Sequence, residues 1–281
     1  MKTLYVSDLD GTLLNSNSAL SEATIKTINA LVEEGMEFTF ATARSITSAS
    51  LVSRGLHLRT PLIVYNGVYL LEPDSHEILY SHSFARQDAQ EILNYLLGHG
   101  MIPFVYSYID GKERVSYMEE GMHEGGKYYM ESRPYDKRFR KVDTTEQLLE
   151  GDVFYFTCIH DGSFLKPMYE YLEETYDYVI VFQQELYREE YWLEVMPRGV
   201  SKAQAILELK EKGGYDRVIS FGDAINDLPM FQISDECYAV ENAIEELKNT
   251  ATAVIGDHDA DAVAMWLKEN YQKKAGGTAD V

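Results

Sequence analysis

The chain has 281 residues, of which 45% are hydrophobic and 25% are charged. This composition is typical of folded globular proteins and excludes extensive disorder, and the length favours about two domains. Acidic residues outnumber basic ones by 46 to 25, which gives a formal net charge of -21. Because so negative a surface repels nucleic acids and anionic membranes, we expect neither as a partner.

The sequence contains two cysteines, Cys158 and Cys237, whose separation matches no zinc motif and no disulfide framework. Both are expected to be small core residues in a reducing compartment. Charged residues arrive too early at the N-terminus for a secretory signal, and no apolar run of about 18 residues is present to span a membrane. We therefore expect a cytoplasmic protein, with a monomer as the default state.

The first 82 residues alternate strand-like apolar runs with helical patterns. Strands are predicted at 4–7, 38–41 and 61–65, and a helix is predicted between the cap Ser21 and Gly35. Strands separated by helices of about a dozen residues indicate βαβ units and a parallel sheet.

The same alternation returns near the end of the chain. The predicted elements are a helix capped by Ser201, strands at 217–221, 238–240 and 253–255, a short helix from Asp227 and a closing helix at 260–271. The two ends of the chain together predict an α/β fold with a doubly wound, mostly parallel, Rossmann-like core.

The middle of the chain has a different pattern. Residues 83–196 are rich in tyrosine and contain longer polar connectors between strand-like segments. This combination favours an α+β domain with an antiparallel sheet. We therefore predict a core formed by 1–82 and 197–281, with 83–196 as one inserted α+β domain.

Two carboxylates follow the first predicted strand. Asp8 and Asp10 belong to the segment DLDGTL at 8–13, at the carboxyl end of that strand, where open α/β sheets bind ligands. The alternative is an ordinary Asp-Gly hairpin, in which the strand folds back onto the residues after Gly11.

A second acidic pair follows the strand at 217–221. Asp223 and Asp227 lie in the segment GDAIND, again at the carboxyl end of a strand. Alternatively, Asn226 and Asp227 merely cap the helix that follows. Capping accounts for one of the two acids but leaves Asp223 unexplained.

The segment DLDGTL followed much later by GDAIND resembles the haloacid dehalogenase superfamily of aspartate-nucleophile phosphatases, and more narrowly its Cof-like sugar-phosphatase branch. The segments ATAR at 41–44 and GVSK at 199–202 fall in the same order, and Asn66-Gly67 fits as well. The resemblance covers both core segments, whereas the middle matches only the placement and size of a C2-type cap. The branch commonly has glycine where this chain has Ala43, and the extra methyl group could narrow the phosphate site.

The resemblance implies a Mg2+-dependent phosphatase that hydrolyses small phosphorylated metabolites, such as sugar phosphates. Asp8 would be the nucleophile that forms an aspartyl phosphate, and Asp10 the general acid and base. The Asp8 carboxylate, the Asp10 carbonyl and the Asp223 carboxylate would hold Mg2+, which prefers hard oxygen ligands.

The remaining motif residues would hold the phosphoryl group. The Thr42 hydroxyl, the Ala43 N–H and Asn226 would bind its oxygens, and Lys202 would supply a positive charge opposite the metal. Asp227 would orient either the metal shell or Lys202.

Several alternatives remain open at this stage. Lys202 could be a solvated helix residue; as a catalytic residue it is expected at the mouth of the site, where its loss would hardly affect folding. Arg44 could touch substrate, although a surface arginine at a helix start is more typical. The same covalent step would also suit a phosphomutase, and a phosphate-sensing, receiver-like regulator would use Asp8 without turnover.

Overall fold

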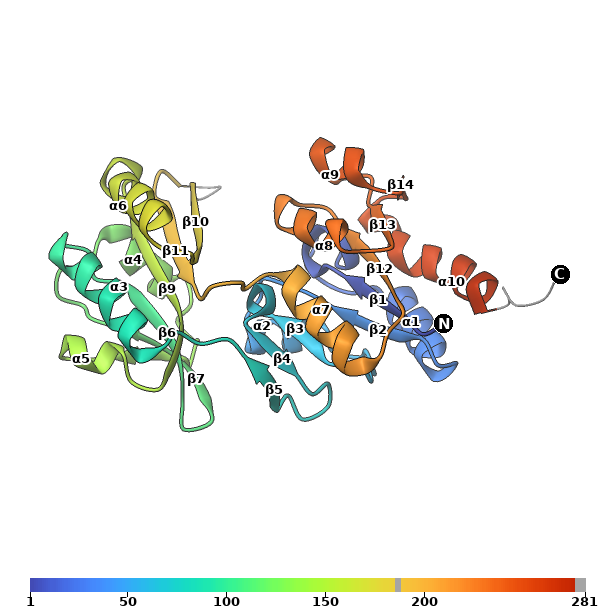
Figure 1. The fold of residues 1–281 in the computed structure, drawn as a ribbon, viewed down its shortest axis with the longest axis horizontal. Helices are drawn as coiled ribbons and strands as arrows, with labels where there is room; N and C mark the ends of the chain where they lie inside the picture. The colour runs from blue at the N-terminus through green and yellow to red at the C-terminus, as the bar shows by residue number, and fades with distance from the viewer. Residues whose placement is uncertain (185–187, 276–281) are drawn as a thin grey trace. The chain divides into compact units, whose positions relative to one another are not determined.

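The computed structural model of the chain describes residues 1–184 and 188–275, with side chains described as far as residue 271. It divides into two compact units, the first formed by Met1–Ser81 with Ser201–Val281 and the second by His82–Val200 (Figure 1). Among the described residues, no helix is both long enough and apolar enough to cross a bilayer.

The first unit is built on a five-stranded parallel sheet with the strand order β14-β13-β12-β1-β2. The strands are β1 (Thr3–Ser7), β2 (Glu37–Phe40), β12 (Arg217–Gly222), β13 (Glu236–Ala239) and β14 (Ala253–Val254). β1 lies inside the sheet and pairs in parallel with both β12 and β2. Its short apolar run is buried, as expected for a strand covered on both faces. The predicted α/β fold with a parallel core is confirmed.

Helices of the first unit follow the strands in the predicted alternation. They are α1 (Glu22–Glu33), α2 (Ile46–Val52), α7 (Lys202–Gly213), α8 (Leu228–Gln232), α9 (Glu245–Thr250) and α10 (Ala262–Ala275). α1 packs against α10, and α7 packs against α8. The predicted caps are present: the side chain of Ser21 accepts a hydrogen bond from Thr24 N, and that of Ser201 accepts one from Gln204 N.

A small antiparallel sheet follows the second helix. It contains β3 (Leu62–Val64), β4 (Tyr69–Leu71) and β5 (Ile78–Ser81), and one bridge between Ala41 and Ile63 joins it to the end of β2. Only β3 was predicted, because a short apolar run such as β4 has no periodicity that separates a strand from a helix. The turn between β3 and β4 places Tyr65 and Asn66 in the left-handed region, with φ of 50° and 52°.

The second unit contains a six-stranded sheet with the order β10-β11-β9-β6-β7-β8, antiparallel except for the pair β7–β8. Its strands are β6 (Phe104–Ile109), β7 (Lys112–Tyr117), β8 (Phe139–Lys141), β9 (Asp152–His160), β10 (Val179–Gln184) and β11 (Tyr191–Met196). Its helices are α3 (Arg86–Gly98), α4 (Glu124–Glu131), α5 (Thr145–Leu148) and α6 (Gly162–Thr175). The inserted segment is therefore α+β with a largely antiparallel sheet, as predicted.

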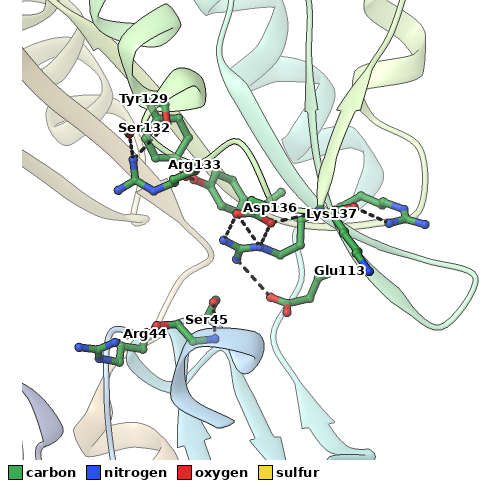
Figure 2. Close-up of polar contacts among 12 residues, drawn as sticks. Arg44, Ser45, Glu113, Tyr129, Ser132, Arg133, Asp136 and Lys137 are labelled. Atoms are coloured by element: carbon green, nitrogen blue, oxygen red, sulfur yellow. Dashed lines mark hydrogen bonds and ion pairs between the residues drawn. The ribbon is translucent and has the colours of Figure 1, made fainter. Parts of the chain in front are cut away.

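The two faces of this sheet have different partners. On one face, Val105 and Phe156 pack with apolar residues of α3 and α6 to form the core of the unit. On the other face, Tyr129 of α4 lies edge-on to Phe104, and its hydroxyl is 2.7 Å from that of Tyr106. Figure 2 shows the polar contacts that follow α4, where Arg133 donates to the carbonyl of Tyr129 and to the Ser132 hydroxyl.

Glu194 of β11 lies on the same face as Tyr106, and burial raises its pKa to about 7, against the effect of a hydrogen bond from Tyr155. Because the folded pKa is higher than the unfolded one, the unfolded chain loses this proton first as pH rises. Stability should therefore fall across the window from the ordinary carboxyl pKa to about 7. As pH rises from 4.5 to about 7, we expect the Tm of Glu194→Gln to rise relative to that of the wild type. A constant difference across this range would contradict the prediction.

Candidate active site

The predicted motif segments meet at one edge of the parallel sheet. Asp8 follows β1, and its N–H donates to the carbonyl of Phe221 in β12 at 2.9 Å. The segment after β2 approaches β1 in the same way, because Ala41 N donates to Ser7 O at 2.9 Å. The Asp-Gly hairpin alternative is wrong, since β1 pairs with β12 and β2, and the chain turns through Gly11 at φ 74° toward α1.

Lys202 connects the acidic segments. Its Nζ donates to Asp8 Oδ1 at 2.5 Å and to Asp227 Oδ1 at 2.7 Å, and its side chain is only 1% exposed. The alternative of a solvated helix residue is therefore wrong. The expected place at the mouth of a site is also corrected, because Lys202 lies on the first turn of α7 inside the core.

The charges in this cluster depend on one another. Burial raises the pKa of Asp8 to about 7, although Lys202 acts in the opposite direction. Burial also opposes the charge on Lys202, but the carboxylates of Asp8 and Asp227 raise its pKa above the ordinary lysine value. A buried ion pair is costly to break, since the remaining partner loses its compensation without regaining water.

Asp227 has both carboxylate oxygens engaged. Oδ1 accepts from Lys202, while Oδ2 accepts from the N–H groups of Asp223 and Ala224 at 3.0 and 3.1 Å. Asp227 is the N-cap residue of α8 by position, but its side chain makes no capping hydrogen bond to that helix and instead accepts from Ala224 N before the turn Ile225–Asp227, so capping of α8 does not account for its carboxylate. Asp227 instead closes the turn after β12 and holds the lysine.

Oxygen ligands for a cation are present beside this pair. Carboxylate oxygens of Asp8, Asp223 and Asp227 lie within 4.8 Å of one another. Asp227 Oδ2 accepts two hydrogen bonds and Oδ1 one, whereas only one hydrogen bond to each of Asp8 and Asp223 is described, so Asp8 and Asp223 have more capacity left to bind a cation. Thr12 Oγ1 donates to Asp223 Oδ1 at 2.9 Å, and burial raises the pKa of Asp223 to about 6. A β-carbon on Gly11 would lie 2.4 Å from Asp223 Oδ2, so only glycine allows this approach. Hard oxygen donors in such a cluster fit Mg2+.

The predicted phosphate ligands occupy the same edge with different exposure. Thr42 is buried, and its hydroxyl accepts from Arg44 N at 3.1 Å, whereas Ala43 and Asn226 are exposed. Ala43 does not have a positive φ, so the backbone here does not require the glycine that is common in the related branch.

Sequence reasoning missed two features of this edge. Arg44 is bound to Asp10 through a two-pronged ion pair, with Nε to Oδ2 at 2.7 Å and Nη2 to Oδ1 at 2.5 Å. The turn at Asn66-Gly67 packs against the start of α7, since a β-carbon on Gly67 would lie 2.4 Å from the carbonyl oxygen of Ser201. Residue spacing carries no signal for either contact.

Known proteins are similar to this chain over most of its length. Residues 5–267 match the family described as haloacid dehalogenase-like hydrolase. The chain is 24% identical to the 5-amino-6-(5-phospho-D-ribitylamino)uracil phosphatase YitU of Bacillus subtilis, over 95% of this chain and 97% of that protein. It is 23% identical to the pyridoxal phosphate phosphatase YbhA of Escherichia coli, over 92% and 95% of the two chains.

Solved structures show the same fold. The crystal structure of TM0651 from Thermotoga maritima superposes with a TM-score of 0.78 at 26% identity, covering 96% of this chain and 97% of that one. Together with the family match, this confirms the resemblance drawn from the motifs. The chain belongs to the haloacid dehalogenase-like hydrolases.

Proposed function

We propose that the protein is a Mg2+-dependent phosphatase that hydrolyses small phosphorylated metabolites, such as sugar phosphates, through an aspartyl phosphate on Asp8. The buried contact of Lys202 with Asp8, next to Asp223, is the observation that carries the proposal. It places a fixed positive charge beside a carboxylate at the ligand-binding edge of the sheet. The relatives named above are phosphatases of small phosphate esters, which supports this substrate class.

In the first step, an oxygen of the Asp8 carboxylate attacks phosphorus and the ester bond to the leaving group breaks. Lys202 stabilises negative charge on Asp8 and on the transferring group, as phosphoryl-transfer sites require. Asp10 gives its proton to the departing alkoxide. When bound by Asp8, the Asp10 carbonyl and Asp223, Mg2+ would neutralise charge on the phosphoryl oxygens.

In the second step, Asp10 takes a proton from water as the water oxygen attacks the phosphorus of the aspartyl phosphate. The bond between phosphorus and Asp8 breaks, which releases inorganic phosphate and restores both carboxyl groups. The Thr42 hydroxyl, the Ala43 N–H and Asn226 hold the phosphoryl oxygens in both steps. We assign discrimination among leaving groups to the second unit, as the cap.

A panel of phosphorylated metabolites tests the proposal directly. We expect release of inorganic phosphate with Mg2+, loss of turnover after exhaustive chelation, and recovery when Mg2+ is added back. Excess Ca2+ should inhibit, because its longer bonds and higher coordination number let it occupy both Asp8 oxygens. Full turnover in the chelated protein would contradict the metal requirement, and an isomeric sugar phosphate in place of inorganic phosphate would indicate a mutase.

A further inference from the structure

Arg44 forms a bidentate ion pair with the carboxylate of Asp10. Its Nε and Nη2 each donate to a different Asp10 oxygen, and its third nitrogen, Nη1, donates to the Ser48 hydroxyl at 2.9 Å. Ser48 lies on α2, so the guanidinium is held at both ends. An exposed ion pair is usually worth only about 0–1 kcal/mol, but a planar two-pronged contact also determines orientation.

The backbone of Arg44 is also fixed by hydrogen bonds. Its N–H donates to the Thr42 hydroxyl, and its carbonyl accepts from Tyr65 N at 2.9 Å. Asn66 N donates to the carbonyl of Thr42 at 2.8 Å. The two donors of these bonds, Tyr65 and Asn66, both have left-handed backbone, which costs about 1–2 kcal/mol for a residue such as tyrosine and less for asparagine. Backbone strain of this kind concentrates where surrounding structure must be positioned for function.

We propose that Arg44 is the positioning residue for Asp10, and that it sets the direction from which Asp10 delivers and receives its proton. This inference rests on the proposed function, in which Asp10 is the general acid and base. Each carboxylate oxygen has two lone pairs, and Arg44 occupies one on each oxygen, so one lone pair per oxygen stays available for a proton. Figure 2 shows Arg44 beside Ser45, in the turn that leads into α2.

Without the guanidinium group of Arg44, the Asp10 carboxyl group would remain but would no longer be held in one orientation. Misplacing a catalytic group by about 1 Å costs on the order of 100-fold in rate. We therefore expect Arg44→Ala to lower kcat on an alkyl phosphate by about that factor, with little change in KM. Arg44→Lys should recover little of the loss, because an ammonium group cannot bind both oxygens in one plane.

The leaving group provides a readout that a structural role would not change. An aryloxide is a stable leaving group and departs without protonation by Asp10. On an aryl phosphate, Arg44→Ala should therefore still form the aspartyl phosphate but hydrolyse it slowly. Mass spectrometry after rapid quenching should find phosphate accumulated on Asp8, as we also expect for Asp10→Asn. Millimolar guanidinium ion should raise the turnover of Arg44→Ala but not that of Arg44→Ala/Asp10→Asn.

A double-mutant cycle and a matched control complete the experiment. If Arg44 acts through Asp10, the double variant should be no slower than Asp10→Asn alone. Arg217 is the control. Like Arg44, its side chain is 20% exposed and forms an ion pair with a carboxylate, that of Glu236. It lies at the start of β12, however, and so at the end of the sheet opposite the candidate site. Arg217→Ala should keep wild-type kcat.

Three outcomes would overturn the inference. A rise in KM at unchanged kcat in Arg44→Ala would place the arginine on the substrate, and additive losses in the double variant would make it independent of Asp10. Wild-type kinetics in Arg44→Ala, with Asp8→Asn and Asp10→Asn impaired, would refute the role of Arg44 alone. If those two aspartate variants also kept wild-type turnover, the proposed function itself would fail.

Discussion

Replacing Asp8 by asparagine is expected to abolish hydrolysis of every phosphate ester, alkyl or aryl. An amide is a poor nucleophile, so the aspartyl phosphate cannot form and no later step can follow. The asparagine side chain oxygen can still accept the hydrogen bond from Lys202, so the variant should fold. Turnover and trapped phosphoprotein are measured together, and both should fall below detection.

Asp10→Asn is the matched comparison for this variant, because it changes the same chemical group two residues later. It keeps the main-chain carbonyl for the metal but loses the acid and base, which is typically worth about 10²–10⁴-fold. It should still show a burst of aryl alcohol, whereas Asp8→Asn should show none. An active Asp8→Asn protein beside a dead Asp10→Asn protein would mean that water attacks phosphorus directly.

Lys202→Met is expected to lose turnover by about 10²–10³-fold or more, because the charge that faces Asp8 and the transferring group disappears. Unlike a surface lysine, it should also lose stability. Asp8 and Asp227 would remain buried without their shared cation, and breaking a buried ion pair in this way costs about 3–5 kcal/mol. Denaturant unfolding and steady-state kinetics measure the two effects separately.

The double variant Lys202→Met/Asp227→Asn separates folding from catalysis. Removing one of the two orphaned carboxylate charges should recover much of the lost stability while leaving turnover low. Lys210→Met on the same helix is the control, since Lys210 is 29% exposed and pairs with Asp235 at 3.7 Å. We expect it to change stability by no more than about 0.5 kcal/mol. Recovery of turnover in the double variant would show that Lys202 serves folding alone.

The core could be predicted because its signals are local. β1 and β12 contain short apolar runs that pair in register, and Asp8 and Asp223 directly follow these two strands. Once the sheet is parallel, these carboxylates must share an edge. The caps at Ser21 and Ser201 are equally local, since each hydroxyl accepts from the N–H three residues later.

The missed features depend on contacts between distant parts of the chain. The burial of Lys202 arises from packing around Asp8 and Asp227, and nothing in the local GVSK segment distinguishes it from an exposed lysine. Arg44 and Asp10 stand in separate turns, and their pairing follows from side-chain directions that spacing does not encode. The positive φ of Tyr65 is uncommon for a residue other than glycine, so the local sequence does not predict it.

The pairing of β1 with β12 also has a consequence for the order of events on the ribosome. β1 has its partner β12 at Arg217–Gly222, on the far side of the second unit in the sequence, so this pair of the parallel sheet cannot form until the whole of the second unit has been synthesised. The strand pairings described for the second unit, His82–Val200, all lie within that segment, which is complete earlier. Domains generally fold as units during synthesis. The inserted unit should therefore fold before β12 is available to pair with β1. Closing such a long connection is slow, and until it closes β1 lacks one of the two strands that flank it in the folded sheet.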